Sequence, residues 1–145
     1  MRVYLDLCAL QRPLDDQAQL RVRLEAEAVL GVLAACALGQ VTLVASDVHY
    51  AETERNPHPN RRDFALEVLR LAPELRSVSG AVSSRAADYA RSGIADLDAL
   101  HLATAVEAGA DYFCTTDDRL LKRGRAVNTG HTRVVTPLEL IVEQP

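Results

Sequence analysis

The sequence contains no tryptophan, only three cysteines and a single lysine, Lys122. Aromatic residues make up 4% of the chain, so it offers few surfaces on which the bases of a single-stranded nucleic acid could stack. Cys8, Cys36 and Cys114 are widely spaced and form no C-x-x-C pair, which argues against a disulfide framework or a zinc site. We therefore expect reduced cysteines in the core of a cytoplasmic protein.

Long apolar runs are also missing. The longest nearly apolar stretch, AVLGVLAACALG, has about 12 residues, which is too short to span a membrane. We expect it to form a buried helix, and no charged-then-apolar segment at the start directs the chain to export. The net charge of −4 excludes a broadly basic surface that would hold nucleic acid by electrostatics alone. Because no apolar run is long enough to span a membrane, we also expect no membrane partner.

Apolar runs rich in β-branched residues alternate with helical patterns along the 145 residues. This alternation predicts an α/β fold with a parallel sheet of four to five strands flanked by helices on both faces. No repeat or linker interrupts the chain, so we expect one domain over residues 1–145. The expected strands are 2–7, 41–46, 75–79, 111–116 and 132–136, and the expected helices are 16–38, 47–55, 61–72, 81–93, 96–110, 117–124 and one beginning at 136.

Several helix ends have local signals. Asp16 is the expected N-cap of the helix 16–38, and the prolines of NPHPN should stop the helix 47–55. At the last helix, Thr136 and Glu139 have the spacing of a capping box, with Pro137 at the first helical position.

Acidic residues fall where the expected strands end. Asp6 is close to the end of the first strand, and Asp117 and Asp118 follow the fourth. Asp98 lies in the first turn of its helix, and Glu52 is about two turns into the short helix after the second strand. Ligands of parallel sheets bind beyond the carboxyl ends of the strands. We therefore expect these acids to meet at one edge of the sheet.

Such a group of carboxylates needs a counterion. At an effective dielectric constant of about 20, two carboxylates ~5 Å apart repel each other by roughly 3 kcal/mol. Hard divalent ions such as Mg²⁺ or Mn²⁺ prefer oxygen ligands and would relieve this repulsion. These ions activate water and stabilise the charge of a phosphodiester under attack. The reaction class indicated is metal-assisted hydrolysis of a phosphate ester.

Four motifs resemble those of the PIN-domain nucleases, a family that includes the VapC-type toxins of toxin–antitoxin pairs. They are RVYLDLC with Asp6, YAETERNP with Glu52, LDALHLATA with Asp98, and YFCTTDD with Asp117. The resemblance covers essentially the whole chain. It implies a metal-dependent endoribonuclease that hydrolyses RNA with Mg²⁺ or Mn²⁺. It also implies an antitoxin protein as a partner and a homodimer as the assembly.

The resemblance assigns roles to individual residues. Asp6 would bind the metal, Glu52 would support it directly or through water, and Asp98 and Asp117 would complete the set of ligands. Thr115, two residues before Asp117, matches a hydroxyl that orients a metal-bound group in the family.

The sequence departs from the family at one position. Leu7 stands where a threonine or serine commonly follows the first aspartate, and the missing hydroxyl could weaken the positioning of metal or water. Asp118 and His101 are expected to support the site from outside the set of ligands.

Each acid also has a structural explanation that the sequence leaves open. The alternatives are a turn at the strand end for Asp6, Glu54 in place of Glu52, Asp96 in place of Asp98, and helix capping by Asp117 shared with Asp118. His101, three residues after Asp98, is expected to be a core or hydrogen-bonding residue rather than a catalytic base.

Three cationic residues are expected to contact RNA phosphates: Arg12, Arg119 and Lys122. The alternative is that these side chains only form a solvent-exposed surface.

Two other enzyme and signalling classes fit poorly. A haloacid-dehalogenase-type phosphatase needs a second aspartate two residues after the first, where this chain has Cys8. A response-regulator receiver needs a lysine at a late strand end, whereas Lys122 falls within an expected helix. The remaining rivals are a PIN-type binding or regulatory domain that has lost cleavage, which Leu7 favours, and a nuclease for structured DNA.

Overall fold

The computed structural model, which describes residues 1–143, contains a four-stranded parallel sheet in the order β2-β1-β5-β6. Its strands are β1 (Arg2–Leu5), β2 (Thr42–Leu43), β5 (Tyr112–Cys114) and β6 (Arg133–Val135). All three pairings between neighbouring strands are parallel. The α/β fold with a parallel sheet that the sequence predicts is therefore confirmed.

The strand predicted over residues 41–46 is divided at Val44 into β2 and β3 (Ala45–Ser46). The Val44 amide still donates to the Val3 carbonyl of β1, at 2.8 Å. Beyond it, β3 turns to pair with β4 (Leu75–Arg76), and the two form a separate small parallel sheet. Of the strand predicted over 75–79, only the first two residues are extended in this pairing.

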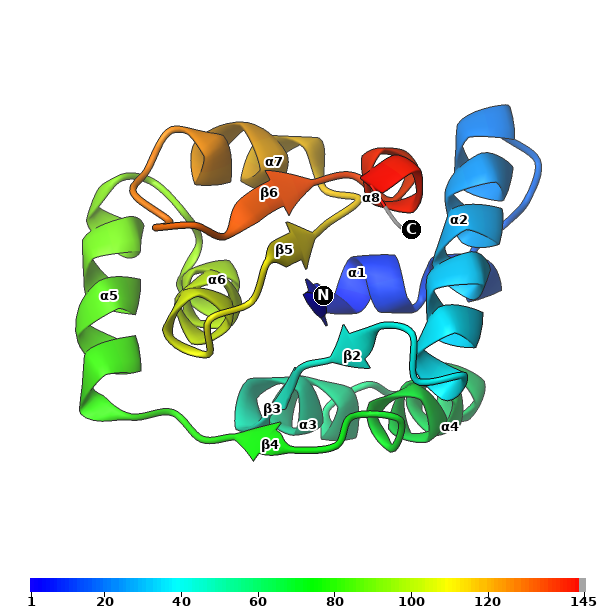
Figure 1. Ribbon diagram of the computed structural model, residues 1–145, viewed down its shortest axis with the longest axis horizontal. Helices are drawn as coiled ribbons and strands as arrows, with labels where there is room; N and C mark the ends of the chain where they lie inside the picture. The colour runs from blue at the N-terminus through cyan, green and yellow to red at the C-terminus, as the bar shows by residue number, and fades with distance from the viewer. Residues whose placement is uncertain (144–145) are drawn as a thin grey trace.

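Helices cover both faces of the four-stranded sheet, as Figure 1 shows. Along β1, side chains alternate between the faces because successive residues of a strand point in opposite directions. Val3 and Leu5 join one buried cluster with α1, α2, α4 and α8, while Tyr4 joins the other with α5, α6 and α7. The helices are α1 (Leu7–Leu10), α2 (Leu20–Ala37), α3 (Asp47–Glu54), α4 (Pro59–Leu69), α5 (Gly80–Arg91), α6 (Asp96–Glu107), α7 (Asp118–Arg125) and α8 (Pro137–Glu143), with a short 3-10 helix η1 (Arg12–Leu14).

The start of the chain differs from the prediction in two respects. The strand expected over 2–7 ends at Leu5, and Asp6 caps the helix α1 by accepting the Leu7 amide at 3.0 Å. The long helix α2 begins at Leu20, so its expected start at Asp16 was wrong. The Asp16 carboxylate accepts the Ala18 amide at 2.9 Å and forms a local turn instead of a helix cap.

Other helix ends follow their local signals. The helix α3 ends at Glu54, shortly before the two prolines, and Pro59 begins α4. At α8, the Thr136 amide donates to the Glu139 carboxylate at 3.0 Å, and the Glu139 amide donates to the Thr136 hydroxyl at 3.2 Å. Both halves of the predicted capping box are present. Gly39 follows α2 with a φ of +75°, a backbone conformation that glycine adopts without strain.

The helix α2 is buried on one face only. Val29 and Val32 are fully buried, whereas Leu20 and Leu30 are 59% and 49% exposed. The expectation of a buried helix was thus half right. Within residues 1–143, every helix is too short or too polar to cross a membrane.

The three cysteines are free, and their environments differ. Cys36 and Cys114 are buried, as expected of core residues, but Cys8 is exposed. Placing Cys8 in the core was wrong because α1 begins at Leu7 and turns the next side chain away from the core.

Candidate active site

Asp6 is a buried carboxylate, and both of its oxygens accept hydrogen bonds from neighbouring residues. It is 5% exposed, and its Oδ2 accepts hydrogen bonds from the Thr115 hydroxyl and the Cys8 thiol, both at 3.0 Å. Burial raises the pKa of Asp6, and hydrogen bonds from Cys8 and Thr115 act in the opposite direction. Because Thr115 follows β5, its hydroxyl links the ends of two neighbouring strands.

Glu52 reaches the same region from α3. Its Oε2 lies 2.6 Å from Nε2 of His101, which is buried in α6. The Glu52 side chain is 31% exposed, so one end of this pair faces solvent while the other is enclosed. On its inner side, Nδ1 of His101 lies 2.6 Å from the Tyr4 hydroxyl of β1.

Asp98 responds to the negative charges around it. Its pKa is raised to about 6, first by burial and then by the negative charges of Asp6, Asp117 and Glu52. The first turn of α6 carries Asp98 toward this group, where it lines a cavity of about 210 Å³ together with Asp117. The four acids Asp6, Glu52, Asp98 and Asp117 therefore lie in one neighbourhood at the carboxyl edge of the sheet.

Asp117 is also the N-cap of α7. Its Oδ1 accepts the amides of Arg119 and Leu120 at 2.9 and 3.2 Å, and its own amide donates to the Thr115 hydroxyl at 3.1 Å. Capping and metal binding are compatible, because Oδ2 takes no part in the cap. Thr115 thus contacts both Asp6 and Asp117, the acids that follow β1 and β5.

The acids left open as alternatives lie elsewhere. Glu54 is exposed on α3, and Asp96 is exposed in the same helical turn as Asp98. Neither is among the charges that shift the pKa of Asp6 or Asp98. Leu7, which replaces the expected hydroxyl, is buried with the core residues of α1 and also lines a cavity with Cys8 and Glu52.

The donor set suits a hard divalent ion. Carboxylate and hydroxyl oxygens dominate it, and the raised pKa of Asp98 reflects an excess of negative charge that a cation would relieve. Within residues 1–143, no three Asp, Glu, His or Cys side chains already stand together as a ready-made set of ligands. The carboxylates of Asp6, Glu52 and Asp117 instead contact protein donors. Binding an ion would therefore require small rotations of these side chains.

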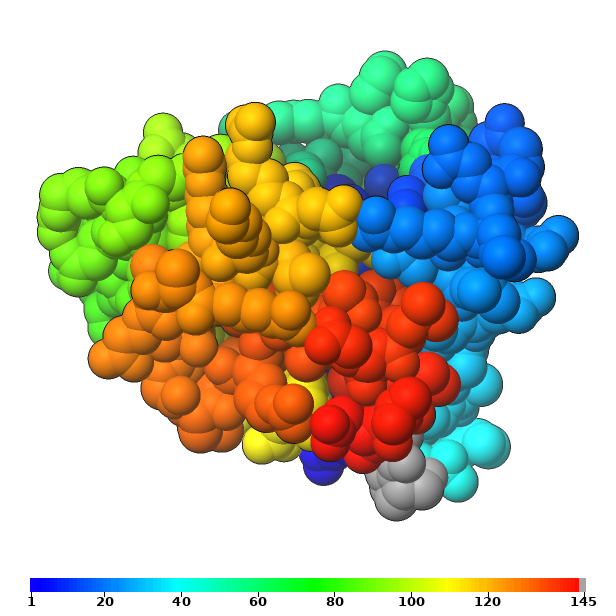
Figure 2. Space-filling view, turned by 90° about the horizontal axis from the view of Figure 1, so that it is seen from above, coloured from blue at the N-terminus to red at the C-terminus, as the bar shows by residue number. Residues whose placement is uncertain are grey.

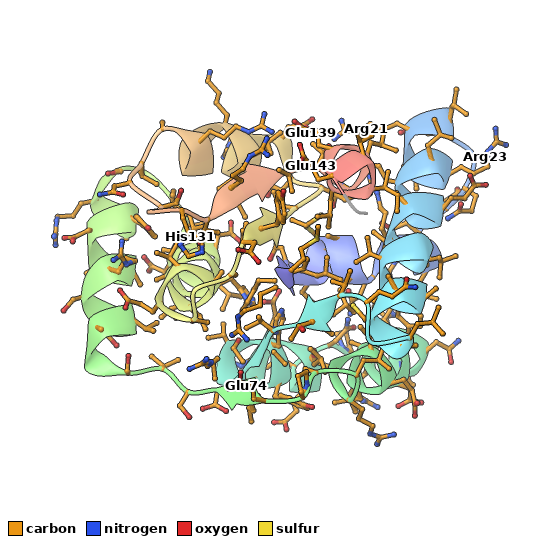
Figure 3. All side chains as sticks on the ribbon, in the orientation of Figure 1. Arg21, Arg23, Glu74, His131, Glu139 and Glu143 are labelled. Atoms are coloured by element: carbon orange, nitrogen blue, oxygen red, sulfur yellow. The ribbon has the colours of Figure 1, made fainter. Side chains whose placement is uncertain are left out.

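One network of ion pairs borders the site, in which Glu25 contacts both Arg12 and Arg21. Arg12 contacts Glu25 at 2.8 Å and Asp15 at 3.0 Å. Arg21, labelled in Figure 3, extends from α2 to α7, where it contacts both carboxylate oxygens of Asp118 at 2.7 and 2.9 Å. Figure 2 shows the blue start of α2 in contact with the yellow start of α7. Arg12 and Asp118 are thus engaged in ion pairs at the rim.

Arg119 and Lys122 are exposed on α7, just beyond Asp117. No ion pair involving either is found in the part of the chain that the structure describes. Arg119 also lines the cavity that contains Asp98 and Asp117.

Sequence reasoning missed two residues that contact the site from within. The Tyr4 hydroxyl and the Ser46 hydroxyl lie 2.8 Å apart, and both residues are fully buried. The signal was available in Tyr4, because the polar end of a tyrosine in an otherwise apolar buried strand needs a hydrogen-bond partner. Ser46 gave no such signal, since only the fold brings it next to Tyr4.

Comparison with known proteins gives two matches. The family model of the PIN domain matches residues 7–126, a range that includes Glu52, Asp98 and Asp117 and begins directly after Asp6. A chain in the crystal structure of VapBC2 from Rickettsia felis bound to a DNA fragment from their promoter is similar, with a TM-score of 0.58 and 12% sequence identity. The similarity covers 92% of this chain and 98% of that chain, and at this identity it shows the fold. No curated protein sequence matches significantly.

Proposed function

The chain belongs to the PIN domain family, and from this premise we propose that it is a metal-dependent ribonuclease that hydrolyses RNA phosphodiesters. The observation that supports the proposal most is the meeting of four acids at one edge of the sheet, where burial and then the negative charges of Asp6, Asp117 and Glu52 raise the pKa of Asp98. Acids from four separate elements that influence one another in this way are suited to binding Mg²⁺ or Mn²⁺. A divalent ion bound there would stabilise the charge that develops on a phosphate under attack.

The residues of this chain would divide the work. Asp6, Glu52, Asp98 and Asp117 would hold the ion, and the Thr115 hydroxyl would keep Oδ2 of Asp6 in place. Helix α7 would carry Arg119 and Lys122 to the phosphates on either side of the cleaved bond. Arg12 would reach a phosphate only after leaving Glu25 and Asp15, so we expect a smaller contribution from it.

We also propose that the protein is the toxin of a toxin–antitoxin pair in the cytoplasm, with an antitoxin protein as partner and a homodimer as the assembly. The similar fold in the VapBC2 complex from Rickettsia felis supports this proposal. Co-expression with the product of the neighbouring gene, followed by purification of a complex and measurement of its mass, tests it. A monomer with no copurifying small protein would count against it.

The nuclease proposal is tested with the purified full chain, Mn²⁺, and a structured RNA and DNA of matching sequence. We expect cleavage of the RNA, and a loss of at least about 100-fold in Asp6→Asn, because one neutral amide replaces the most enclosed carboxylate. Asp16→Asn is the matched control, since Asp16 is exposed in the turn before α2. We expect it to cleave as fast as the wild type.

Each other result has a definite meaning. Equal cleavage by Asp6→Asn would remove Asp6 from the site. Preferential cleavage of the DNA would identify a structured-DNA nuclease. Binding of RNA without cleavage would favour a PIN-type regulatory domain, the alternative that Leu7 suggests.

A further inference from the structure

A buried line of hydrogen bonds runs through the molecule and ends at Glu52. The Ser46 hydroxyl lies 2.8 Å from the Tyr4 hydroxyl, which lies 2.6 Å from Nδ1 of His101. Nε2 of His101 lies 2.6 Å from Oε2 of Glu52. Ser46, Tyr4 and His101 are fully buried, and they come from three different elements, β3, β1 and α6. Only the Glu52 end is open to solvent.

At the inner end of this line, the contacts of His49 determine which group donates each hydrogen bond. Nε2 of His49 lies 2.7 Å from the Leu5 carbonyl, which can only accept, so this nitrogen carries a hydrogen. Since burial lowers the pKa of His49 to about 3, the ring is neutral and Nδ1 accepts the Ser46 amide at 3.2 Å. The Ser46 hydroxyl in turn accepts the His49 amide at 3.3 Å. It keeps its own hydrogen to donate to Tyr4.

The outer end is fixed by Glu52. An ionised carboxylate can only accept, so Nε2 of His101 carries a hydrogen and donates to it. Nδ1 of His101 is then free to accept from the Tyr4 hydroxyl, which receives its own hydrogen bond from Ser46. Every donor along the line therefore points toward Glu52. Assigning the ring hydrogens in this way leaves each polar group with a partner.

Packing holds the line rigid. The Tyr4 ring stacks on the His49 ring with centroids 4.4 Å apart and on the Phe113 ring at 5.6 Å. The His101 ring meets the edge of Tyr4 at 5.7 Å. Because the aromatic rings fix the Tyr4 hydroxyl, the imidazole of His101 cannot rotate without losing hydrogen bonds on both sides.

We propose that Tyr4 and His101 are positioning residues that orient the Glu52 carboxylate toward the ion of the candidate active site. The inference rests on the proposed function only in treating Glu52 as a ligand, since the hydrogen bonds exist without the ion. Partners behind the ligands of metal sites commonly contribute about 10–100-fold to metal affinity. A purely structural role would affect stability and leave metal affinity unchanged.

The test uses Tyr4→Phe, which removes one oxygen and keeps the stacked ring. Tyr89→Phe is the matched control, because Tyr89 is also buried and its hydroxyl donates to the Asn128 carbonyl at 2.6 Å, outside the line. Two quantities are measured on the full chain. The first is the ¹⁵N NMR spectrum of the histidine rings without metal, and the second is the dissociation constant of Mn²⁺ by electron paramagnetic resonance.

For the wild type we expect His101 to be a single tautomer with hydrogen on Nε2. Tyr4→Phe should shift the ring nitrogens toward a mixture of tautomers, because Nδ1 loses its donor, and should raise the dissociation constant of Mn²⁺ by about 10-fold. Tyr89→Phe should change neither. At His101 itself, His101→Gln should retain more Mn²⁺ affinity than His101→Ala, since the amide still offers a donor.

The proposal is overturned if Tyr4→Phe leaves both the His101 tautomer and the Mn²⁺ affinity unchanged, or if Tyr89→Phe weakens Mn²⁺ binding equally. Should Tyr4→Phe fail to fold, equal Mn²⁺ affinities for His101→Gln and His101→Ala would overturn it as well. If the wild type binds no Mn²⁺, both the proposed metal-dependent function and the positioning roles of Tyr4 and His101 are wrong. If the expected NMR and Mn²⁺ results appear without RNA cleavage, the positioning roles stand and only the proposed function fails.

Discussion

At the scale of single residues, the ionised carboxylate of Asp98 in the candidate active site lowers the stability of the folded protein. Asp98 has a pKa raised from 3.8 to about 6, which means that folding disfavours its ionised form. Burial is the larger cause and repulsion from Asp6 and Asp117 the next. Without a cation, this carboxylate therefore destabilises the folded protein at neutral pH.

We predict that Asp98→Asn stabilises the metal-free protein by about 1–2 kcal/mol at pH 7.5, allowing for partial exposure of the side chain to solvent. The gain should shrink as the pH falls through 6 toward 3.8, because wild-type Asp98 then takes up a proton and becomes neutral. Urea denaturation with EDTA present measures it. The same variant should bind Mn²⁺ more weakly.

Asp96→Asn is the control for this substitution, because Asp96 lies in the same turn of α6 but is exposed. Removing its charge should leave stability nearly unchanged or slightly lower, since the N-terminus of a helix favours negative charge. Equal stabilisation by the two variants would mean that repulsion within the site is not the cause.

At the scale of elements, α7, the helix that Asp117 caps, packs close to the sheet at a glycine. A Cβ added at Gly124 would lie 3.3 and 3.4 Å from the two methyl groups of Val134 on β6, and 3.6 Å from Leu102 on α6. Val134 is buried and β-branched, so its side chain cannot easily move aside. Gly124 therefore sets how closely α7 approaches β6.

We predict that Gly124→Ala destabilises the protein by about 1 kcal/mol, although alanine normally favours a helix over glycine. Gly80→Ala is the matched control, because a Cβ at Gly80, the first residue of α5, meets no atom within 4 Å. It should be neutral or slightly stabilising. Thermal unfolding of the two variants gives the comparison, and a stabilised Gly124→Ala would show that β6 yields to the added methyl group.

At the scale of the whole molecule, stability in acid is set by groups that act in opposite directions. The raised pKa values of Asp6 and Asp98 let the folded protein take up protons before the unfolded chain, which favours folding as the pH falls. His49 acts the other way, since burial lowers its pKa from 6.5 to about 3. Below pH 6.5 the unfolded chain binds a proton at this residue that the folded protein excludes.

We predict that His49 removes about 2–3 kcal/mol of stability between pH 6.5 and pH 4.5. In His49→Gln, the free energy of unfolding should fall less over this range than in the wild type, whatever its absolute value. His58→Gln, at an exposed histidine, should keep the slope of the wild type. Urea denaturation at several pH values measures the three slopes, and identical slopes would contradict the prediction.

The sequence alone determined the class of fold and the neighbourhood of the acids. Alternating strand and helix patterns imply a parallel sheet, and such a sheet brings the residues after β1 and β5 to one edge. The capping box of Thr136 and Glu139 was equally predictable, because it depends on residues three apart. These features are local, or follow from topology, so a pattern along the chain is sufficient to predict them.

Only the tertiary structure decided which partners each side chain meets. The helix α1 was missed because Asp6 can end a strand or cap a helix, and packing of Leu7 and Leu10 selects the second. The line from Ser46 through Tyr4 and His101 to Glu52 joins residues up to 97 positions apart. No pattern along the chain reports such contacts, because they depend on the distances that the packed core sets between β1, β3, α3 and α6.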